Sequence, residues 1–187
     1  MQRAYHGRST GNGVAGLIKE RADVARAVTQ AAAIASHVQY AALPYRVDGS
    51  ARTEIMLITS RERRRWIIPK GWPHKGRAPH RSAAREAFEE AGVVGKVRRR
   101  PVGTFSYHKR HKNGSVTVCE VRVFALRVRR QSRKWPEKDE RDFQWMPAAR
   151  AAKRVKDPRL GEIILRIAGI KPAPARRAKS TSRRVAA

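Results

Sequence analysis

The stretch Gly71–Val93 reads GWPHKGRAPHRSAAREAFEEAGV and contains the most informative pattern in the chain. Within it, Glu86, Glu89 and Glu90 are spaced i, i+3 and i+4, so a helix would place them on one face, one turn apart. Three carboxylates this close repel one another and disfavour the helix unless a cation compensates them. Mg²⁺ and Mn²⁺ accept such oxygen ligands and also hold substrate phosphates. The sequence therefore predicts a helix that carries a divalent-metal site.

The same stretch contains the local signals that begin and end a helix. Pro79 suits a first turn, and Gly92 stands where a helix C-terminus favours a left-handed residue, so we predict a helix from about Pro79 to Ala91. Arg85 precedes the first glutamate, and its planar guanidinium group suits holding a carboxylate in place. Taken alone, the string is also compatible with ordinary solvated helix charges. The apolar positions expected to pack on a sheet are Ala83, Ala87, Phe88 and Ala91.

The spacing of the fixed residues resembles the Nudix signature. That signature is Gly, five residues, Glu, seven residues, Arg-Glu, an apolar residue, any residue, Glu-Glu, any residue, Gly and an apolar residue. The segment matches every fixed position except one, where Arg77 replaces the first glutamate, and the apolar position after Arg-Glu is the small Ala87. In the family the replaced glutamate supports the loop and helix more than it binds the metal. We therefore expect retained activity, with weaker metal affinity or a different metal preference.

The resemblance extends outside this box, over roughly residues 38–167. The runs SRERRRWIIPKGWP, residues 60–73, and KWPEKDERDFQWM, residues 134–146, are similar to the diphosphoinositol polyphosphate phosphohydrolase branch of the family. The resemblance implies an α/β fold, specifically a Nudix-type α/β/α sandwich around a mixed β-sheet. It also implies hydrolysis of a nucleoside diphosphate linked to another group, or of a related diphosphate.

By the same resemblance, the box residues have expected roles. Glu89 and Glu90 are expected to bind the metal, with the carbonyl group of Gly71 assisting. Glu86 is expected to be a further ligand or the base that activates water, and Arg85 to orient a glutamate. The expected cofactor is Mg²⁺ or Mn²⁺, which neutralises phosphate charge and lowers the pKa of a bound water.

The composition points to anionic partners. The chain has 187 residues, and 43 Lys and Arg against 15 acidic residues give a formal charge of +28. Such a field attracts polyanions, which include nucleic acid, anionic membrane and small phosphate-rich molecules, and composition alone does not choose among them. Cys119 is the single cysteine, so an internal disulfide and a Cys-based zinc site are both excluded. We expect it to be a small buried residue.

Alternating apolar patterns and turn signals predict a mixed α/β domain. The first hairpin is expected to turn at Asp48-Gly49, and the later long hairpin at Asn113-Gly114. The predicted strands are 38–47, 53–59, 66–68, 97–107, 115–128 and 143–145. The predicted helices, besides the one in the box, are 148–155 and 160–167.

We predict one folded domain between two extensions. Residues 1–37 are expected to be a mobile arm, in which 15–36 could form a helix, and the domain is expected to span 38–170. Residues 171–187 carry only basic charges and two prolines, which is typical of a disordered basic tail. The least polar stretch of the N-terminal arm, residues 25–43, is interrupted by polar side chains, so we expect no membrane span and a cytoplasmic protein.

Basic residues that flank the box are candidates for a phosphate pocket. In the branch that the chain resembles, basic residues from these regions contact a highly phosphorylated inositol. A generally basic, solvated surface is the alternative for any single one of them. The residues predicted to bind substrate are Arg46, Arg61, Lys70 and His108.

Several other side chains have two interpretations. Tyr107 and Trp135 could stack on a base but are at least as readily packed. Glu120 could be an extra metal ligand, although a salt bridge with Arg122 or Arg127 is the safer expectation. The reserve candidates for a catalytic base are Glu137 and Glu140.

The leading hypothesis is a metal-dependent hydrolase that cleaves a phosphoanhydride bond. The expected substrate is a small phosphate-rich molecule, such as a diphosphoinositol polyphosphate or a diadenosine polyphosphate. The alternatives are a nucleotide-sugar or ADP-ribose pyrophosphatase, and a Nudix-fold RNA-binding protein that has lost catalysis. Non-specific contact with RNA or another polyanion is expected through the basic tail.

Overall fold

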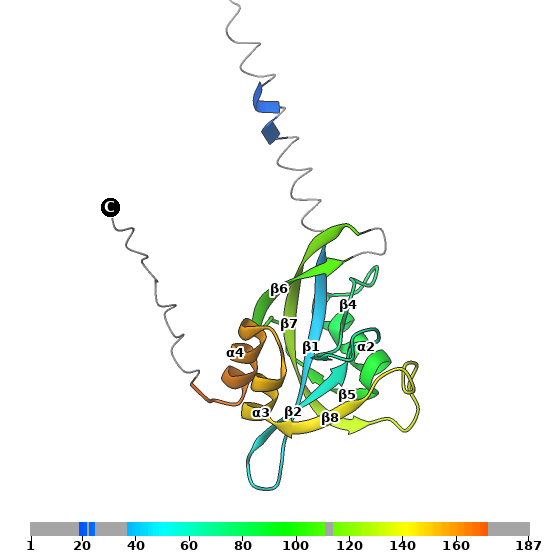
Figure 1. Cartoon of the computed structure of the whole chain (residues 1–187), viewed down its shortest axis with the longest axis vertical. Coiled ribbons are helices and arrows are strands. Elements are labelled where there is room, and N and C mark those ends of the chain that lie inside the picture. The colour runs from blue at the N-terminus through cyan, green and yellow to red at the C-terminus, as the bar shows by residue number, and fades with distance from the viewer. Residues whose placement is uncertain (1–18, 22, 25–36, 111–113, 172–187) are drawn as a thin grey trace, which may run out of the picture.

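One mixed sheet of eight strands forms the centre of the molecule (Figure 1). The strands are β1 (Val38–Val47), β2 (Thr53–Thr59), β3 (Trp66–Ile67), β4 (Lys70–Gly71), β5 (Val93–Val97), β6 (Gly103–Arg110), β7 (Val116–Gln131) and β8 (Phe143–Pro147). The main path runs β3-β2-β1-β7-β5, with β4 paired to β1, β6 to β7 and β8 to β2. Only the central pair, β1 and β7, is parallel among the pairings of the described strands, so this pair makes the sheet mixed.

The structure, a computed structural model, describes residues 19–21, 23–24, 37–110 and 114–171. Residues 19–21 and 23–24 are helical, and the rest of the predicted arm lies outside the described residues. The predicted tail also lies outside them, except for Lys171. The predicted domain limits at 38 and 170 therefore stay predictions. No helix in the described ranges is long and apolar enough to cross a membrane.

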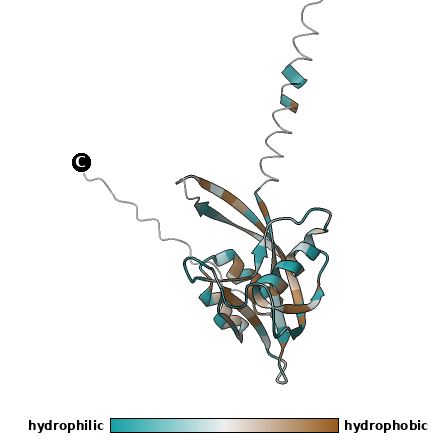
Figure 2. Ribbon diagram, turned by 90° about the vertical axis from the view of Figure 1, so that its right-hand side faces the viewer, coloured by the Kyte–Doolittle hydropathy of each residue, from teal (hydrophilic) through white to brown (hydrophobic). Residues whose placement is uncertain are grey.

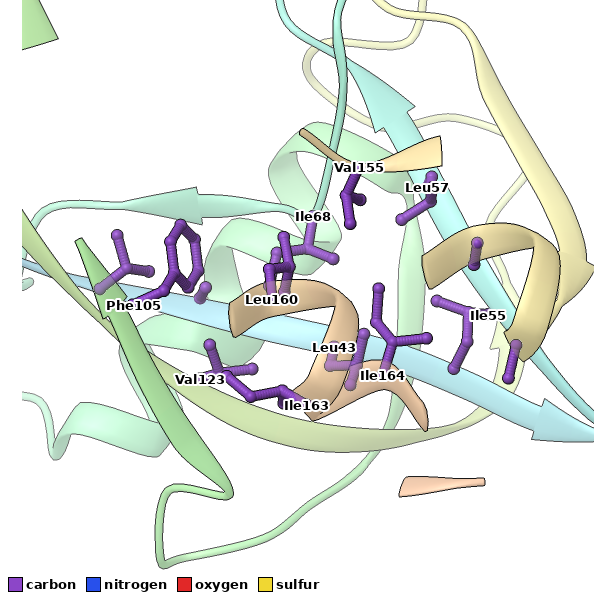
Figure 3. Close-up of a cluster of buried hydrophobic side chains, with 14 of the residues drawn as sticks. Leu43, Ile55, Leu57, Ile68, Phe105, Val123, Val155, Leu160, Ile163 and Ile164 are labelled. Carbon is purple, nitrogen blue, oxygen red and sulfur yellow. The ribbon is translucent and has the colours of Figure 1, made fainter. Parts of the chain in front are cut away.

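Helices cover both faces of the sheet, as the predicted α/β/α sandwich requires. They are α2 (Pro79–Ala91), α3 (Ala148–Arg154) and α4 (Pro158–Ile167). Side chains alternate along a strand, so Leu43 of β1 packs in the cluster that contains α3 and α4, whereas Ala42 packs in the cluster that contains α2. Figure 3 shows the first cluster, where Leu160 and Ile164 of α4 lie against strand residues. The two clusters fix α2 on the opposite face from α3 and α4.

Most predicted elements are confirmed. The bounds of β1, β2 and α2 agree with the predicted ones, and Cys119 is buried. The first turn is longer than a two-residue loop, because the Asp48 carboxylate accepts hydrogen bonds from the backbone N–H groups of Ser50 and Arg52. Phe88 was predicted on the packing face of the box helix, but it is 37% exposed. It lies on the outer side of α2, where it lines a surface cavity with Arg81 and Arg85.

The predicted strand 97–107 is wrong in its extent. The structure has two strands there, β5 and β6, separated by residues 98–102. Both pair antiparallel with the same long strand, β7, at Val97↔Leu126 and Gly103↔Val123. The interruption contains Pro101, which has no N–H group to donate to the ladder. The local pattern of apolar residues could not show that β7 would pair with two strands in succession, β5 and β6.

The hairpin of β6 and β7 projects beyond the helices (Figure 1). Figure 2 shows apolar and polar residues alternating along it. Val116 and Val118 near its tip are about half exposed, at 48% and 57%. The root of the hairpin, by contrast, belongs to the core through Phe105 and Val121.

Candidate active site

The box helix α2 brings three carboxylates to the edge of a cleft. Its buried face consists of small residues, so the helix approaches β1 and β5 closely. These residues are Ser82, Ala83, Ala87 and Ala91. The helix ends at Gly92, whose φ of 67° is left-handed and whose N–H donates to the carbonyl group of Phe88. A Cβ at Gly92 would lie 2.5 Å from the Trp135 ring, so this end of α2 is also packed tightly.

Glu90 is the most buried of the three carboxylates, with 6% exposure. It forms an ion pair with the equally buried Arg141, which precedes β8. Its Oε2 also accepts a hydrogen bond of 3.0 Å from the backbone N–H of Lys70. Burial raises the pKa of Glu90 to about 7, although Arg141 acts in the opposite direction. Glu90 therefore joins α2 to β4 and to the segment before β8.

Glu86 occupies space that exists only because residue 71 is glycine. A Cβ built on Gly71 would lie 2.2 Å from the Cδ and Oε2 atoms of Glu86. On the other side, Oε1 of Glu86 lies 2.9 Å from Nε2 of His74. Burial raises the pKa of Glu86, and the hydrogen bond with His74 partly offsets this. The glutamate of the Arg-Glu pair is thus held between β4 and the loop before α2.

We expect Gly71→Ala to lower kcat/KM for a pyrophosphate substrate by about 10²-fold, because displacing a reacting group by an ångström has effects of that size. The displaced group is the Glu86 carboxylate. Steady-state kinetics and circular dichroism should be measured together. Gly49→Ala is the matched control, since nothing lies within 4 Å of a Cβ at Gly49. Equal kinetics in the two variants would show that the position of Glu86 is unimportant.

Glu89 lies beside the other potential metal donors. Nε of Arg85 donates to Oε1 of Glu89 at 2.7 Å, which is the kind of carboxylate contact expected for this arginine. One donor atom each from His74, Glu86 and Glu89 lie within 4.8 Å of one another, and all three side chains are half-buried. Two carboxylates and an imidazole at this separation suit a divalent cation, which would also relieve the repulsion between the carboxylates. The residues present therefore fit a metal.

Arg77, which stands where the signature has glutamate, does not face this donor set. Its side chain lines a separate cavity of about 280 Å³ on the outer side of α2, together with Arg81, Arg85 and Phe88. Its backbone N–H donates to the carbonyl group of His74, so the residue helps to form the loop before the helix. The replacement removes one acid from the loop without placing a positive charge among the metal donors.

A cleft of about 680 Å³ opens beside Glu86 and Glu90. Among the predicted substrate-binding residues, Arg61 and Lys70 line it. The Lys70 ammonium group lies 5.2 Å from the centre of the Tyr107 ring, and burial lowers the pKa of Lys70. Both carboxylates and cations thus line the cleft.

A second cavity of about 360 Å³ adjoins this cleft and shares Lys70 and Tyr107 with it. Its lining is largely apolar and aromatic, and it also contains charged residues. The apolar residues include Trp66, Ile68, Phe105 and Leu160. The basic residues include Arg63, Arg65 and Lys156, and the acids Glu62 and Asp157 also line the cavity, as does His108. His108, a predicted substrate-binding residue, therefore lines this second cavity and not the carboxylate cleft.

Arg46 lies apart from both cavities. It is at the far end of β1, where Nε donates to Glu54 at 2.7 Å and the guanidinium group lies 4.3 Å from the Trp145 ring centre. Arg61 reaches the cleft but is also ion-paired, with Glu137 and Glu140. The structure thus brings Arg61 and Lys70 to the carboxylate cleft and places His108 in the adjoining cavity. Arg46 lies away from both.

The contacts of Glu120, Trp135 and Tyr107 bear on the two interpretations that the sequence allowed for each. Nε of Arg122 donates to Glu120 at 2.9 Å, as the salt-bridge alternative expects. Trp135 packs edge-on against Phe143, with ring centres 5.9 Å apart. The Tyr107 hydroxyl donates to Gln39 at 2.8 Å while its ring lines both cavities.

Glu137, a reserve candidate for the base, lines the cleft. It accepts hydrogen bonds from Arg61 and Arg141, and its backbone N–H donates to the carbonyl group of Glu89. Glu140, the other candidate, pairs with Arg61 and is not among the residues that line the cleft.

Two central residues were given no role by sequence reasoning. His74 sits in a position that the signature leaves open, and Arg141 follows an acidic run that resembles an exposed loop. For Arg141 the only signal was its place between Glu140 and Asp142 in a segment similar to other phosphohydrolases. For His74 we find no signal in the local pattern, because its partner Glu86 is twelve positions away and pairing depends on how the loop folds.

Comparison with known proteins gives consistent matches. The sequence matches the NUDIX domain over residues 37–167. It is 34% identical over 107 residues to "Nudix hydrolase 13, mitochondrial" of Arabidopsis thaliana, which covers 54% of this chain and 52% of the relative. It is 38% identical over 73 residues to diphosphoinositol polyphosphate phosphohydrolase 3-beta of Bos taurus, covering 36% of this chain and 44% of that one. The chain thus spans about half the length of these relatives.

Solved structures with the same fold include two enzymes of low sequence identity. The Ap4A hydrolase of C. elegans superposes with a TM-score of 0.51 at 17% identity, covering 71% of this chain and 96% of that one. The dihydroneopterin triphosphate pyrophosphohydrolase of E. coli gives 0.52 at 17% identity, covering 70% and 94%. At this identity the similarity establishes the fold.

Proposed function

The chain belongs to the NUDIX domain family, and from this premise we propose that it is a metal-dependent hydrolase that cleaves a phosphoanhydride bond in a phosphate-rich substrate. The observation that carries the proposal is a cleft that is lined by Glu86 and Glu90 and also by Arg61 and Lys70. A substrate with several phosphates complements such a cleft, since cations bind the phosphates and the carboxylates serve a metal and a proton acceptor. The names of the Arabidopsis and bovine relatives support the same class of reaction.

The residues that would hold the cation are Glu86 and Glu89, with the Gly71 carbonyl group assisting as the family pattern implies. When bound, a divalent cation neutralises phosphate charge and lowers the pKa of water. Glu90 is also a ligand in the family pattern, but in this structure Arg141 and the Lys70 N–H occupy its oxygens. We assign Glu90 the role of holding Arg141 and β4 in place around the cleft.

The other steps belong to side chains of the cleft. Lys70 and Arg61 would bind phosphate oxygens and position the scissile bond. Glu86 lines the cleft and would accept the proton of the attacking water through the carboxylate oxygen that does not hold the cation. Glu137 is the weaker acceptor, since both of its oxygens accept hydrogen bonds from guanidinium groups, those of Arg61 and Arg141.

Among phosphate-rich substrates, the second cavity favours one that carries an aromatic ring. Trp66, Phe105 and Leu160 offer apolar contact, which suits a nucleobase better than a fully phosphorylated cyclitol. Arg63, Arg65 and Lys156, which also line it, would meet the phosphates that follow the ring. We therefore propose a diadenosine polyphosphate as a better substrate than a diphosphoinositol polyphosphate. A nucleotide sugar or ADP-ribose fits the cavity too, but leaves more of these cations without phosphate.

A substrate panel tests this function. The full-length protein should be incubated with Mg²⁺ or Mn²⁺ and a diadenosine polyphosphate, a diphosphoinositol polyphosphate, ADP-ribose or a nucleotide sugar, and the products identified by mass spectrometry. We expect turnover that a chelator abolishes, with the highest kcat/KM on the diadenosine polyphosphate. Absence of turnover on every compound, together with tight RNA binding, would support a non-catalytic protein of the same fold. Faster cleavage of the inositol compound would overturn only the substrate preference.

A further inference from the structure

We infer that His74 is a direct ligand of the divalent cation, a residue that the family signature does not specify; this rests on the proposed function. The imidazole Nε2 lies 2.9 Å from Oε1 of Glu86 and belongs to the donor set that also contains Glu89. The box lacks one acid, because Arg77 replaces it and faces the outer side of α2. His74 adds a nitrogen donor beside the two half-buried carboxylates, Glu86 and Glu89.

The loop holds His74 ready for this role. Its backbone N–H donates to the hydroxyl group of Ser82, which is fully buried in α2, and its carbonyl group accepts from Arg77. The residue is therefore fixed at both ends of its backbone, and its side chain lines the carboxylate cleft. A ligand needs this kind of fixed placement, because a mobile side chain would lose conformational entropy on binding.

A nitrogen ligand changes which metals the site prefers. Mg²⁺ takes oxygen donors, whereas an imidazole suits the first-row transition metals and raises affinity for Mn²⁺, Co²⁺ and Zn²⁺ relative to Mg²⁺. We therefore expect the protein to bind Mn²⁺ more tightly than Mg²⁺, and His74→Gln to weaken Mn²⁺ binding by about tenfold or more while changing Mg²⁺ binding much less.

Pulsed electron paramagnetic resonance of the Mn²⁺-loaded full chain tests the ligand directly. We expect a nitrogen coupling from a coordinated imidazole that is lost in His74→Gln and kept in His80→Gln. His80 is the matched control because it lies in the first turn of α2, close in sequence to His74, but is not in the donor set. Mn²⁺ and Mg²⁺ affinities should be measured by calorimetry on the same three proteins.

The outcomes separate this inference from the proposed function. If Mn²⁺ binds and Glu89→Gln removes it, but no nitrogen coupling is seen, the site is made of carboxylates alone and the role of His74 is wrong. The same conclusion follows if His74→Gln weakens Mg²⁺ and Mn²⁺ binding equally, since His74 would then only position Glu86. If the protein binds neither metal and has no turnover, the proposed function fails as well.

A second, independent observation concerns one open face of the sheet, formed by Lys96, Arg98, Arg127 and Arg129, here named the β5–β7 cationic face. Lys96 and Arg127 are direct cross-strand partners, and all four side chains are exposed. Arg127 and Arg129 alternate with Leu126 and Val128, which pack on the α2 side, so the cations occupy the opposite face. Like charges placed directly opposite one another destabilise a sheet.

No acid of the described residues forms an ion pair with any of these four cations. The geometry points to a nucleic-acid backbone as the partner of this face. A row of phosphates would neutralise the charges on both strands at once and release counterions. The exposed large apolar side chains lie elsewhere, for example at Val116, Val118 and Phe143, so the face lacks the apolar anchors that membrane insertion uses.

Charge-matched variants of the full chain test this face. We expect the triple variant Lys96→Gln/Arg127→Gln/Arg129→Gln to bind a fluorescent single-stranded RNA of 20 nucleotides at least about tenfold more weakly. It should also make the slope of log affinity against log salt shallower by about 2, because each phosphate contributes about 0.7. The control Arg150→Gln/Lys153→Gln/Arg159→Gln removes three exposed charges from α3 and α4. We expect it to have a much smaller effect.

Three results would overturn the nucleic-acid assignment. Equal weakening by both variants would mean that only total charge matters. Unchanged RNA binding with self-association of the first variant would mean that the cations keep the edge strand β5 from pairing with another molecule. Loss of binding to anionic lipid vesicles, with RNA binding intact, would assign the face to a membrane surface.

Discussion

Glu89→Gln is expected to lower kcat on the best pyrophosphate substrate by roughly 10³-fold, the size of effect seen when one charge-stabilising group is removed from a reaction centre. Glu89 belongs to the donor set with His74 and Glu86, and its own oxygen already accepts a hydrogen bond from Arg85. Glutamine keeps the shape but has no negative charge, so the cation loses a ligand. The fold should persist, because Glu89 is only half-buried and is not among the residues of either core cluster.

Turnover and circular dichroism of Glu89→Gln should be compared with those of Glu162→Gln. Glu162 is an exposed residue of α4, and its replacement removes the same charge far from the cleft. Full activity in the control and loss in Glu89→Gln is the expected pattern. Activity near that of the wild type in both variants would show that α2 carries no catalytic metal site, since its carboxylates would then be ordinary surface charges.

Arg141→Met is expected to lower the free energy of unfolding by about 3–5 kcal/mol, the range for removing one partner of a buried ion pair. Arg141 and Glu90 have side chains that are each 7% exposed, so the variant leaves a carboxylate buried without its cation. Arg141 also donates to Glu137 and to the carbonyl group of Thr59, which links α2 to β2 and to the segment before β8. For a domain of this size the melting temperature should fall by roughly 10 °C.

The pH dependence of this loss has a definite sign. Burial raises the pKa of Glu90 to about 7, above its unfolded value. At a pH between these two pKa values, Glu90 is therefore protonated in the folded protein and ionised in the unfolded chain. Protonation of Glu90 removes the unpaired charge of the variant. The loss in the free energy of unfolding caused by Arg141→Met should therefore become smaller as pH falls from 8 to 5.5. Thermal melts should be recorded without divalent cations at both pH values.

Two further variants identify the cause of the destabilisation. Glu90→Gln/Arg141→Met should recover part of the lost stability, since the introduced amide is neutral and its oxygen can still accept from the Lys70 N–H. Arg61→Met should cost less than about 1 kcal/mol, because Arg61 is half exposed although it also pairs with Glu137. If Arg141→Met lowers the free energy of unfolding no more than Arg61→Met does, the buried ion pair of Arg141 and Glu90 does not stabilise this part of the cleft.

Local sequence was sufficient for the box helix. Pro79 and Gly92 mark its ends through backbone preferences that act within a few residues, and the predicted bounds agree with α2. The spacing of Glu86, Glu89 and Glu90 placed them on one side of that helix for the same reason. The family pattern carried the rest of the fold, including the mixed sheet with helices on both faces.

Longer-range features could not be read from the sequence. The break between β5 and β6 depends on both strands sharing β7 as a partner, which no local pattern states. Of the four predicted substrate-binding residues, Arg46 was placed wrongly relative to the box, because it lies at the end of β1 away from the cleft.

The sequence by itself therefore determined which residues carry the charge and which helix presents it, since helix periodicity and end signals are local. Only the tertiary structure decided how each carboxylate is used. Glu90 meets Arg141 across 51 positions and Glu86 meets His74 across 12, and both pairings exist because sheet register and loop packing bring distant segments together. Three similar glutamates thus acquire a buried ion pair, a histidine partner and an arginine partner, because burial and neighbouring charge depend on the whole fold.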